Sequence, residues 1–307
     1  MTEMTESKNG RYHTPVMLDE VIWLMNPKPG GTYVDCTLGS GGHTLGLVER
    51  MGTGGTIVGI DRDEDAIAAA KRELKHCSDS LIFVNGSFSE LEEIVRSLDI
   101  EQVDGILFDL GVSSYQLDEP LRGFSYTENG PLDMRMQQGK GVSASDLVNN
   151  LPFEELRDIL KDYGEERWAS RIAEFIVKRR DTAPILTTGE LVEVIKAAIP
   201  ASARRSGPHP ARRTFQALRI AVNRELDELR SGLGQAVRIL APGGRLVVIS
   251  YHSLEDRIVK TVFRKMSGSR NQGCLRILTK KPIIPSKEEV ISNPRSRSAK
   301  LRAAEKF

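Results

Sequence analysis

The sequence predicts an α/β fold with a mostly parallel, doubly wound sheet and a helical insertion. Short apolar runs alternate with amphipathic stretches from residue 32 to residue 109, which is typical of β-α-β units in a parallel sheet. A glycine-rich loop at residues 39–42 follows the first apolar run and predicts a tight turn from a buried strand into a helix. The strand pattern then stops and returns only at residue 245. This interruption predicts an inserted segment.

The first part of the predicted sheet alternates strands with helices. Three of its strands carry an aspartate at the carboxyl end: Asp35, Asp61 and Asp109. The carboxyl ends of parallel strands meet at one edge of a sheet, where ligands bind, so we expect these carboxylates on one rim. Strands are predicted at residues 32–37, 56–61, 81–84 and 103–109, and helices at residues 18–25, 42–51, 64–74 and 90–98.

The insertion is predicted from helical periodicity. After a loop-like stretch at residues 113–140, helices are expected at residues 144–149, 154–161, 166–179 and 190–198. Beyond them we expect a long helix at 215–240 that stops at Ala241-Pro-Gly-Gly244, a strand at 245–251, a helix at 253–266 and a hairpin within 275–284. The predicted domains are a disordered leader at 1–10, a discontinuous Rossmann-like domain at 11–140 and 214–307, and a helical insertion at 141–213.

The composition excludes several classes of protein. The formal net charge is only +1 over 307 residues, so a nucleic-acid surface has to be a local patch. The cysteines Cys36, Cys77 and Cys274 are odd in number and widely spaced, which argues against a disulfide framework or zinc site and for a reducing compartment. No apolar run reaches the roughly 18 residues of a membrane span. We expect a cytoplasmic protein without a metal.

The glycine loop and the end of the second strand together indicate an adenosine-type cofactor. Gly39, Gly41 and Gly42 leave backbone amides free to meet a ligand. Asp61 lies about 20 residues after the first glycine, where an acid accepts hydrogen bonds from both ribose hydroxyls. A dinucleotide fingerprint would require glycine at the sixth position of the loop, which is Thr44.

The charge of Asp35 separates the two candidate cofactors. A carboxylate is repelled by a pyrophosphate in a shielded site, whereas S-adenosylmethionine carries a cationic sulfonium and no phosphate. The sequence therefore favours S-adenosylmethionine over a nicotinamide dinucleotide. Phe88, in the turn after the third strand, is a candidate to stack on adenine. His43 is a candidate ligand residue, although a structural role is the alternative for both side chains.

Asp109 is the candidate catalytic residue. It ends the fourth strand and opens the segment Asp109-Leu-Gly-Val-Ser-Ser114. Methyl transfer is an in-line displacement that needs no metal, and an enzyme contributes mainly by holding nucleophile and methyl carbon about 3 Å apart. If the acceptor is an exocyclic amine, a carboxylate that accepts its N–H localises the nitrogen lone pair and takes up developing positive charge. The alternative is a purely structural role at the strand end.

Basic residues concentrate in two segments, which suggests contacts with phosphates on a chain of nearly neutral charge. His252, after the fifth strand, is a candidate either to touch substrate or to serve a structural role. The first segment contains Arg204, Arg205, His209, Arg212, Arg213 and Arg219, and the second contains Arg295, Arg297, Lys300 and Arg302.

These residues closely resemble one family, the bacterial MraW/RsmH methyltransferases of small-subunit ribosomal RNA. The resemblance runs almost from end to end in one order, so chance similarity is a poor explanation. The matching segments are His13-Thr-Pro-Val-Met-Leu-Asp-Glu20, Asp35-Cys-Thr-Leu-Gly-Ser-Gly-Gly-His-Thr44, Gly59-Ile-Asp-Arg-Asp63, Asp104-Gly-Ile-Leu-Phe-Asp-Leu-Gly-Val-Ser-Ser114, Arg122-Gly-Phe-Ser125, Gly130-Pro-Leu-Asp-Met-Arg-Met136, Arg212-Arg-Thr-Phe-Gln-Ala-Leu-Arg219 and Ser250-Tyr-His-Ser-Leu-Glu-Asp-Arg257, followed by the Arg-Ser-Ala-Lys tail.

The resemblance implies methylation of the N4 amine of a cytosine in the decoding region of 16S rRNA, within the small ribosomal subunit, with S-adenosylmethionine as methyl donor. It also implies a helical insertion that recognises RNA. Gln116 joins the site from the resemblance alone. The segment Asp109-Leu-Gly-Val departs from the Asn/Asp-Pro-Pro-aromatic motif of many amine methyltransferases, which leaves open how the amine is held. The implied cofactor-binding residues are Gly41, Gly42, His43, Asp61, Phe88, Asp109 and Gln116.

Other functions compete with this interpretation. The nearest is an amine methyltransferase that acts on DNA or protein, and another is an RNA-binding scaffold without turnover. The acids at three strand ends count against a scaffold, and the missing sixth glycine counts against an NAD-dependent oxidoreductase. The sequence leaves open whether the substrate is naked RNA or an assembled subunit, and whether the chain is a monomer or a homodimer.

Overall fold

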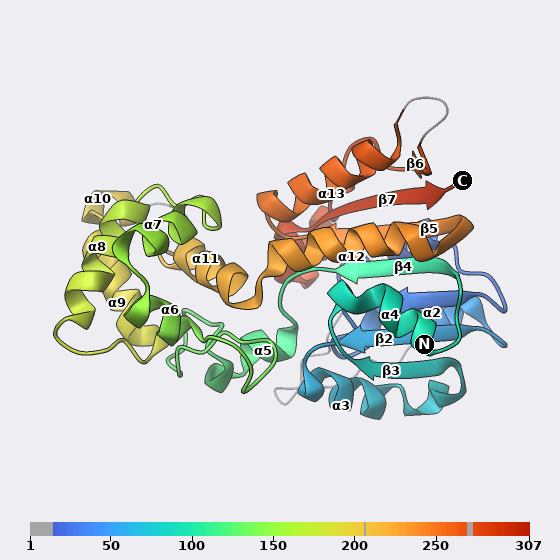
Figure 1. Ribbon diagram of the computed structural model, residues 1–307, viewed down its shortest axis with the longest axis horizontal. Helices are drawn as coiled ribbons and strands as arrows, with labels where there is room; N and C mark the ends of the chain where they lie inside the picture. The colour runs from blue at the N-terminus through green and yellow to red at the C-terminus, as the bar shows by residue number, and fades with distance from the viewer. Residues whose placement is uncertain (1–14, 206, 269–272) are drawn as a thin grey trace. The chain divides into compact units, whose positions relative to one another are not determined.

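The chain forms two compact units in the computed structural model, which describes residues 15–205, 207–268 and 273–307 (Figure 1). Met1–Ser113 and Leu226–Phe307 make up the first, here called the sheet unit, and Ser114–Glu225 make up the second, the helical unit. The predicted leader at residues 1–10 lies outside the described residues. None of the helices in the described ranges is both long and apolar enough to cross a membrane.

The sheet unit is built on a seven-stranded sheet with the order β3-β2-β1-β4-β5-β7-β6. Strands β1 to β5 run parallel, and β7 pairs antiparallel with both β5 and β6. This confirms the predicted Rossmann-like fold, and the strand order reverses between β1 and β4, where such sheets bind ligands. The strands are β1 (Thr32–Asp35), β2 (Thr56–Asp61), β3 (Leu81–Asn85), β4 (Val103–Asp109), β5 (Leu240–Ser250), β6 (Leu275–Ile277) and β7 (Lys300–Lys306).

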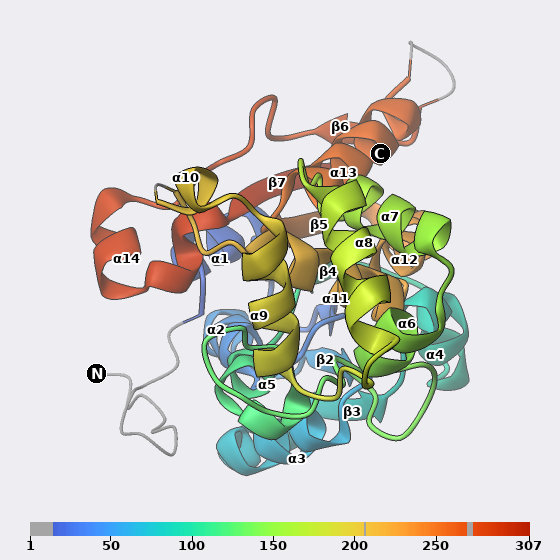
Figure 2. The same cartoon turned by 90° about the vertical axis from the view of Figure 1, so that its left-hand side faces the viewer.

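Helices cover the sheet because their apolar faces complete its core. On one face, side chains of the first two helices pack against the inner strands, for example Val21, Leu47 and Ile57, each 0% exposed. The last helix lies near the start of the first, where the Met17 N–H donates to Glu289 over 2.7 Å (Figure 2). The helices are α1 (Leu18–Met25), α2 (Gly42–Met51), α3 (Glu64–Glu73), α4 (Leu91–Ser97), α12 (Glu225–Ile239), α13 (Ser253–Met266) and α14 (Lys287–Ser292), with 3-10 turns at Lys75–Ser80, Phe88–Glu90 and Pro294–Ser298.

The end of the chain corrects one prediction. Lys300 and Arg302 were expected in a basic tail that contacts phosphates, but both belong to strand β7, which lies between β5 and β6. Arg302 is only 7% exposed, and its Nε lies 2.6 Å from Asp256 Oδ1. Arg302 is therefore part of the interior and not a phosphate ligand. The predicted hairpin within residues 275–284 supplies only the short edge strand β6.

The predicted long helix at residues 215–240 is also wrong in detail. The structure has two helices there, α11 (Arg212–Asn223) in the helical unit and α12, and Arg224 between them adopts a left-handed φ of 51°. Asn223 fixes the break, since its buried side-chain amide donates to Met134 O and accepts from Met136 N, both over 2.8 Å. The following Ala241-Pro-Gly-Gly244 lies inside β5, next to a shift in its pairing with β4.

The helical unit is wider than the predicted insertion at residues 141–213. The loop before it belongs to the unit because hydrogen bonds tie it to later helices, such as Gly130 N–H to Thr188 Oγ1 over 3.0 Å. Its core contains Leu160, Ile176 and Leu218, each 0% exposed. Its other helices are α5 (Ser114–Asp118), α6 (Ala144–Asn150), α7 (Phe153–Asp162), α8 (Ala169–Arg180), α9 (Thr188–Ala198) and α10 (Ala201–Arg204), with a 3-10 turn at Pro120–Arg122.

Candidate functional site

The loop between β1 and α2 requires glycine for steric reasons. Gly41 has a φ of 87°, and a Cβ atom there would lie 2.6 Å from Leu74 Cδ1. A Cβ atom on Gly42 would lie 2.5 Å from Pro15 Cγ. The chain therefore turns closely into α2, whose first-turn N–H groups lack partners within the helix and favour an electron-rich ligand atom. The expectation of free backbone amides on all three loop glycines is wrong for two of them, because the Gly39 N–H donates to Asp61 Oδ2 over 2.9 Å and the Gly41 N–H donates to Leu38 O over 2.8 Å.

Asp61 is held in a fixed orientation at the end of β2. Its Oδ2 accepts the Gly39 N–H and its Oδ1 accepts the Asp63 N–H, each over 2.9 Å. Each carboxylate oxygen has a second lone pair, so both remain able to accept a hydroxyl. Burial raises the pKa of Asp61 to about 6, against the opposing effect of the two backbone N–H groups. These two acceptor oxygens fit a ribose, whose two hydroxyls can donate to them.

The carboxylate of Asp35 is buried and does not lie on the rim, where it had been expected. It does lie at the carboxyl end of β1, but it is 1% exposed and accepts Thr44 Oγ1 over 2.8 Å and the Thr37 N–H over 3.1 Å. Burial raises its pKa. The carboxylate therefore fastens the glycine turn from inside, and the rim presents two of the three expected acids.

Asp109 is the centre of a small hydrogen-bonded cluster. Its Oδ1 accepts the Tyr251 hydroxyl over 2.7 Å, and its Oδ2 lies 3.6 Å from His43 Nδ1. Its backbone N–H donates to Thr37 Oγ1 over 2.6 Å. Burial raises the pKa of Asp109, while His43 and the Tyr251 hydroxyl oppose that effect by favouring the charged form. The carboxylate is 24% exposed, so it is both positioned and accessible.

His43 connects this cluster to the start of the described chain. Its Nε2 lies 2.9 Å from Val16 O. Because a carbonyl oxygen can only accept a hydrogen bond, this contact assigns a proton to Nε2. His43 is 7% exposed. Its Nδ1 lies 3.6 Å from Asp109 Oδ2, which is beyond hydrogen-bond distance. The contact with cofactor that was predicted for His43 stays a prediction.

The structure places Phe88 against the core. Its ring stands edge-on to Phe108 with centroids 5.4 Å apart, and the Arg62 guanidinium lies 5.8 Å above it. A Cβ atom on Gly232 of α12 would come within 2.8 Å of the ring. The residue follows β3 at the same edge as Asp61, so adenine stacking stays a prediction. Gln116 belongs to α5 of the helical unit and is 4% exposed.

Comparison with known proteins identifies the family. The sequence model of the MraW methylase family matches residues 10–307. The chain belongs to the MraW methylase family. It is 50% identical over 313 residues to "Ribosomal RNA small subunit methyltransferase H" of Heliobacterium modesticaldum, covering 96% of this chain and 99% of that relative. Proteins of the same name from Halothermothrix orenii and Clostridioides difficile are 51% and 48% identical over 308 residues, and each match covers 96% of this chain.

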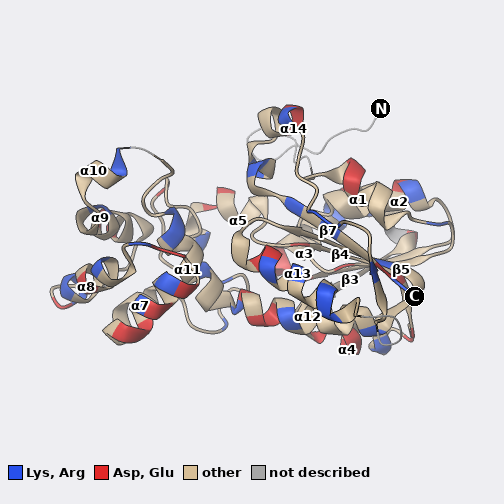
Figure 3. Cartoon of the chain, turned by 90° about the horizontal axis from the view of Figure 1, so that it is seen from above, with Lys and Arg blue, Asp and Glu red and all other residues tan. Residues whose placement is uncertain are grey.

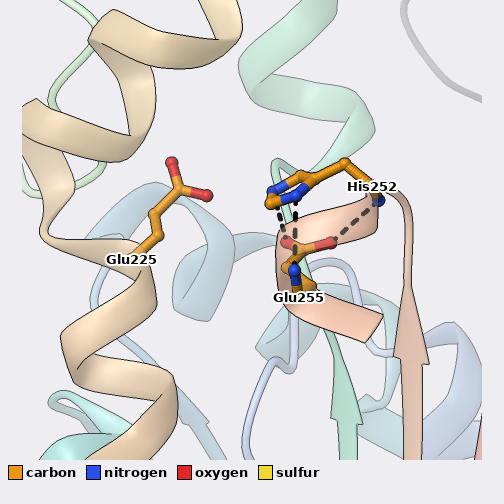
Figure 4. A group of neighbouring side chains, drawn as sticks. All are labelled: Glu225, His252 and Glu255. Atoms are coloured by element: carbon orange, nitrogen blue, oxygen red, sulfur yellow. Dashed lines mark hydrogen bonds and ion pairs between the residues drawn. The ribbon is translucent and has the colours of Figure 1, made fainter. Parts of the chain in front are cut away.

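In this MraW family member, the structure adds Tyr251 to the predicted site. The segment Ser250-Tyr-His-Ser-Leu-Glu255 pointed to its histidine instead, because histidine is the more frequent catalytic residue. His252 is the N-cap of α13, and the Glu255 carboxylate accepts its backbone N–H over 3.2 Å (Figure 4). The same carboxylate accepts the Tyr251 N–H over 2.8 Å. His252 thus caps α13, and Glu255 fixes the backbone at Tyr251.

Proposed function

We propose that the chain is an S-adenosylmethionine-dependent methyltransferase that methylates the N4 amine of a cytosine in 16S rRNA of the small ribosomal subunit. One observation carries the proposal. A positioned carboxylate, Asp109, stands beside a glycine turn at the ligand edge of the sheet, in a chain about half identical over its length to proteins named for small-subunit rRNA methylation.

The residues present fit the proposed cofactor. Bound S-adenosylmethionine supplies an activated methyl group. Asp61 offers oxygens for the ribose hydroxyls. Gly41 and Gly42 form the close turn into α2 after β1, and the first-turn N–H groups of that helix favour an electron-rich ligand atom. Phe88 is proposed to cover the adenine, and Gln116 is proposed to contribute from the helical unit. No dinucleotide is expected, since Thr44 occupies the place of the third glycine.

Asp109 is the proposed catalytic residue. An exocyclic amine is a poor nucleophile because its lone pair is delocalised into the ring. The carboxylate would accept one N–H of the amine, localise the lone pair and stabilise positive charge on nitrogen as the bond to carbon forms. The Tyr251 hydroxyl holds the carboxylate in place, so it needs no reorganisation at that moment.

The helical unit is the proposed RNA-recognition part. Blue segments on α8, α10 and α11 mark Lys and Arg residues on it (Figure 3). Several basic residues of the first predicted segment serve internal contacts as well. Arg213 donates to Glu165 O over 2.9 Å, and Arg219 pairs with Glu225 over 2.8 Å. Arg205 is exposed and remains a candidate for phosphate contact.

A methyl-transfer assay tests the proposal. Small ribosomal subunits from a strain that lacks this gene are incubated with the protein and labelled S-adenosylmethionine, then digested with nuclease and analysed by mass spectrometry. Label on cytosine N4 at one RNA site is the expected result. Label on DNA or protein alone would leave the methyltransferase core but remove the RNA assignment, and failure to bind the cofactor would overturn the proposal.

A further inference from the structure

A cavity of about 450 Å³ opens in the sheet unit beyond Tyr251. Tyr251, His252 and Ser253 line it from the end of β5 and the start of α13, and the segments around α14 and β7 supply the rest. The volume is within the range of about 300–1,000 Å³ typical of small-ligand sites. Because Tyr251 also donates to Asp109, the cavity begins one side chain away from the proposed reacting carboxylate.

One side of the cavity is cationic. Arg297 lines it, is exposed, and has no acidic partner within ion-pair distance among the residues that the structure describes. Lys300 also lines it, and its Nζ lies 3.9 Å from Asp256 Oδ2. Asp256 is already paired with the buried Arg302 over 2.6 Å, so its charge is shared between two cations. This side therefore favours an anion such as a phosphodiester.

Other residues of the lining are apolar. Ile284, Pro285 and Val290 contribute to the lining, and Ile284 is 66% exposed although it is a large aliphatic residue. An apolar wall beside a guanidinium and an ammonium fits a nucleotide, whose base and ribose carry apolar faces and whose phosphate is charged. Ser253 and Ser298 complete the lining.

We propose that this cavity binds one nucleotide of the rRNA strand adjacent to the target cytosine. Its phosphate contacts Arg297 and Lys300, and its base or ribose lies on the wall at Ile284. The inference rests on the proposed function, because it takes rRNA as the substrate. RNA bases are read where strands are unpaired and splayed apart, and a neighbour held in a separate cavity would keep the target cytosine extended toward Asp109.

Equilibrium binding of unmethylated small ribosomal subunits tests the cavity without requiring turnover. Arg297→Gln is expected to weaken binding about 5–10-fold and to reduce the dependence of log Kd on log salt by about one unit. Arg264→Gln is the matched control, because it removes the same charge from an exposed position of α13 outside the cavity. Its affinity is expected to stay within twofold of the wild type.

A second pair of variants tests the apolar wall. Ile284→Asp replaces the apolar surface expected under the base or ribose with a charged side chain and should weaken binding at least as much. Ile291→Asp, at a position on α14 that is 80% exposed and does not line the cavity, should not. Equal effects within either pair, or no binding of subunits by the wild type, would overturn the cavity assignment.

A parallel measurement separates this inference from the proposed function. Calorimetric binding of S-adenosylmethionine should be unchanged in all four variants, since none touches the glycine turn or Asp61. If the wild type methylates rRNA while Arg297→Gln and Arg264→Gln behave alike, only the cavity inference fails. If the wild type binds subunits through the cavity but transfers no methyl group, the proposed function fails.

Discussion

At the residue scale, the chemistry depends on how the Tyr251 hydroxyl holds the Asp109 carboxylate. Asp109→Asn removes the charge while it keeps the shape. We expect turnover to fall by about 10²- to 10⁴-fold, because the amide cannot stabilise positive charge on the amine. Single-turnover methyl transfer to small ribosomal subunits measures this. Full turnover together with unchanged cofactor affinity would contradict the catalytic assignment.

Tyr251→Phe distinguishes positioning from catalysis at the same site. The variant loses only the 2.7 Å hydrogen bond to Asp109 Oδ1, so we expect a loss of about tenfold in turnover. That bond favours the charged carboxylate, so its removal should raise the pKa of Asp109 and move the acidic limb of the pH–rate profile to higher pH. An unshifted limb would argue that Tyr251 serves only packing.

Asp61 gives the cofactor affinity a defined pH dependence. Its pKa is raised to about 6 in the folded protein, so the carboxylate gains a proton as the pH falls through that value and loses acceptor capacity toward the ribose. S-adenosylmethionine affinity should therefore weaken below about pH 6, as measured by calorimetry between pH 5 and pH 8. In Asp61→Asn the affinity should be lower at neutral pH and nearly flat over this range. A wild-type affinity that does not change would contradict the ribose assignment.

The same protonation affects stability in the opposite direction. The ordinary pKa of Asp61 is 3.8 and the folded value is about 6, so between these values the folded state holds more protons than the unfolded state. The contribution of Asp61 to stability therefore increases as the pH falls from neutrality toward 4. Protonation of Asp61 therefore stabilises the cofactor-free protein, whereas it weakens cofactor binding.

At the element scale, a substitution in strand β7 tests whether Arg302 has a structural role. Arg302→Ala leaves Asp256, which is 15% exposed, without its main partner, and we expect a loss of roughly 3 kcal/mol in the free energy of unfolding. Arg276→Ala is the matched control, because Arg276 also forms an ion pair in this sheet, with Glu305, but is 60% exposed. Its expected loss is below about 1 kcal/mol. Denaturant titration measures both, and equal losses would contradict a structural role for Arg302.

Elements with strong local patterns were predictable from the sequence, and those set by distant contacts were not. The strand and helix at 56–61 and 42–51 match because their apolar periodicity and flanking glycines are local. Strand β7 was missed because its charged sequence becomes a strand only through pairing with β5 and β6. The break at Arg224 has neither glycine nor proline to announce it.

The candidate site shows the same division. The strand-end argument located Asp61 and Asp109 because the end of a parallel strand is itself a local signal. It also placed Asp35 on the rim, although two hydrogen bonds turn that carboxylate inward. Tyr251 was missed because its contact with Asp109 joins positions 142 residues apart. The sequence pattern therefore predicts where in the fold the site lies, but not how its side chains are arranged.

At the scale of the whole molecule, each unit has a core of its own. Replacing residues 114–225 with a flexible linker should leave a sheet unit that unfolds cooperatively and still binds S-adenosylmethionine, although more weakly because Gln116 is gone. Binding to small ribosomal subunits should fall by at least tenfold. Circular dichroism, calorimetry and equilibrium binding check these outcomes, and retained subunit affinity would contradict a role of the helical unit in RNA recognition.

The pairing of β4 with β5 has a consequence for how the chain acquires its structure. These neighbouring strands join Val103 to Leu240, with the whole helical unit between them in sequence. Bringing such distant segments together is entropically costly and slow when the intervening chain is loose. Helices depend on local contacts, so they can form first and shorten the chain that separates β4 from β5. Early folding of the helical unit would then speed closure of the sheet, so a variant that destabilises only the inserted helices should delay the appearance of cofactor binding during refolding.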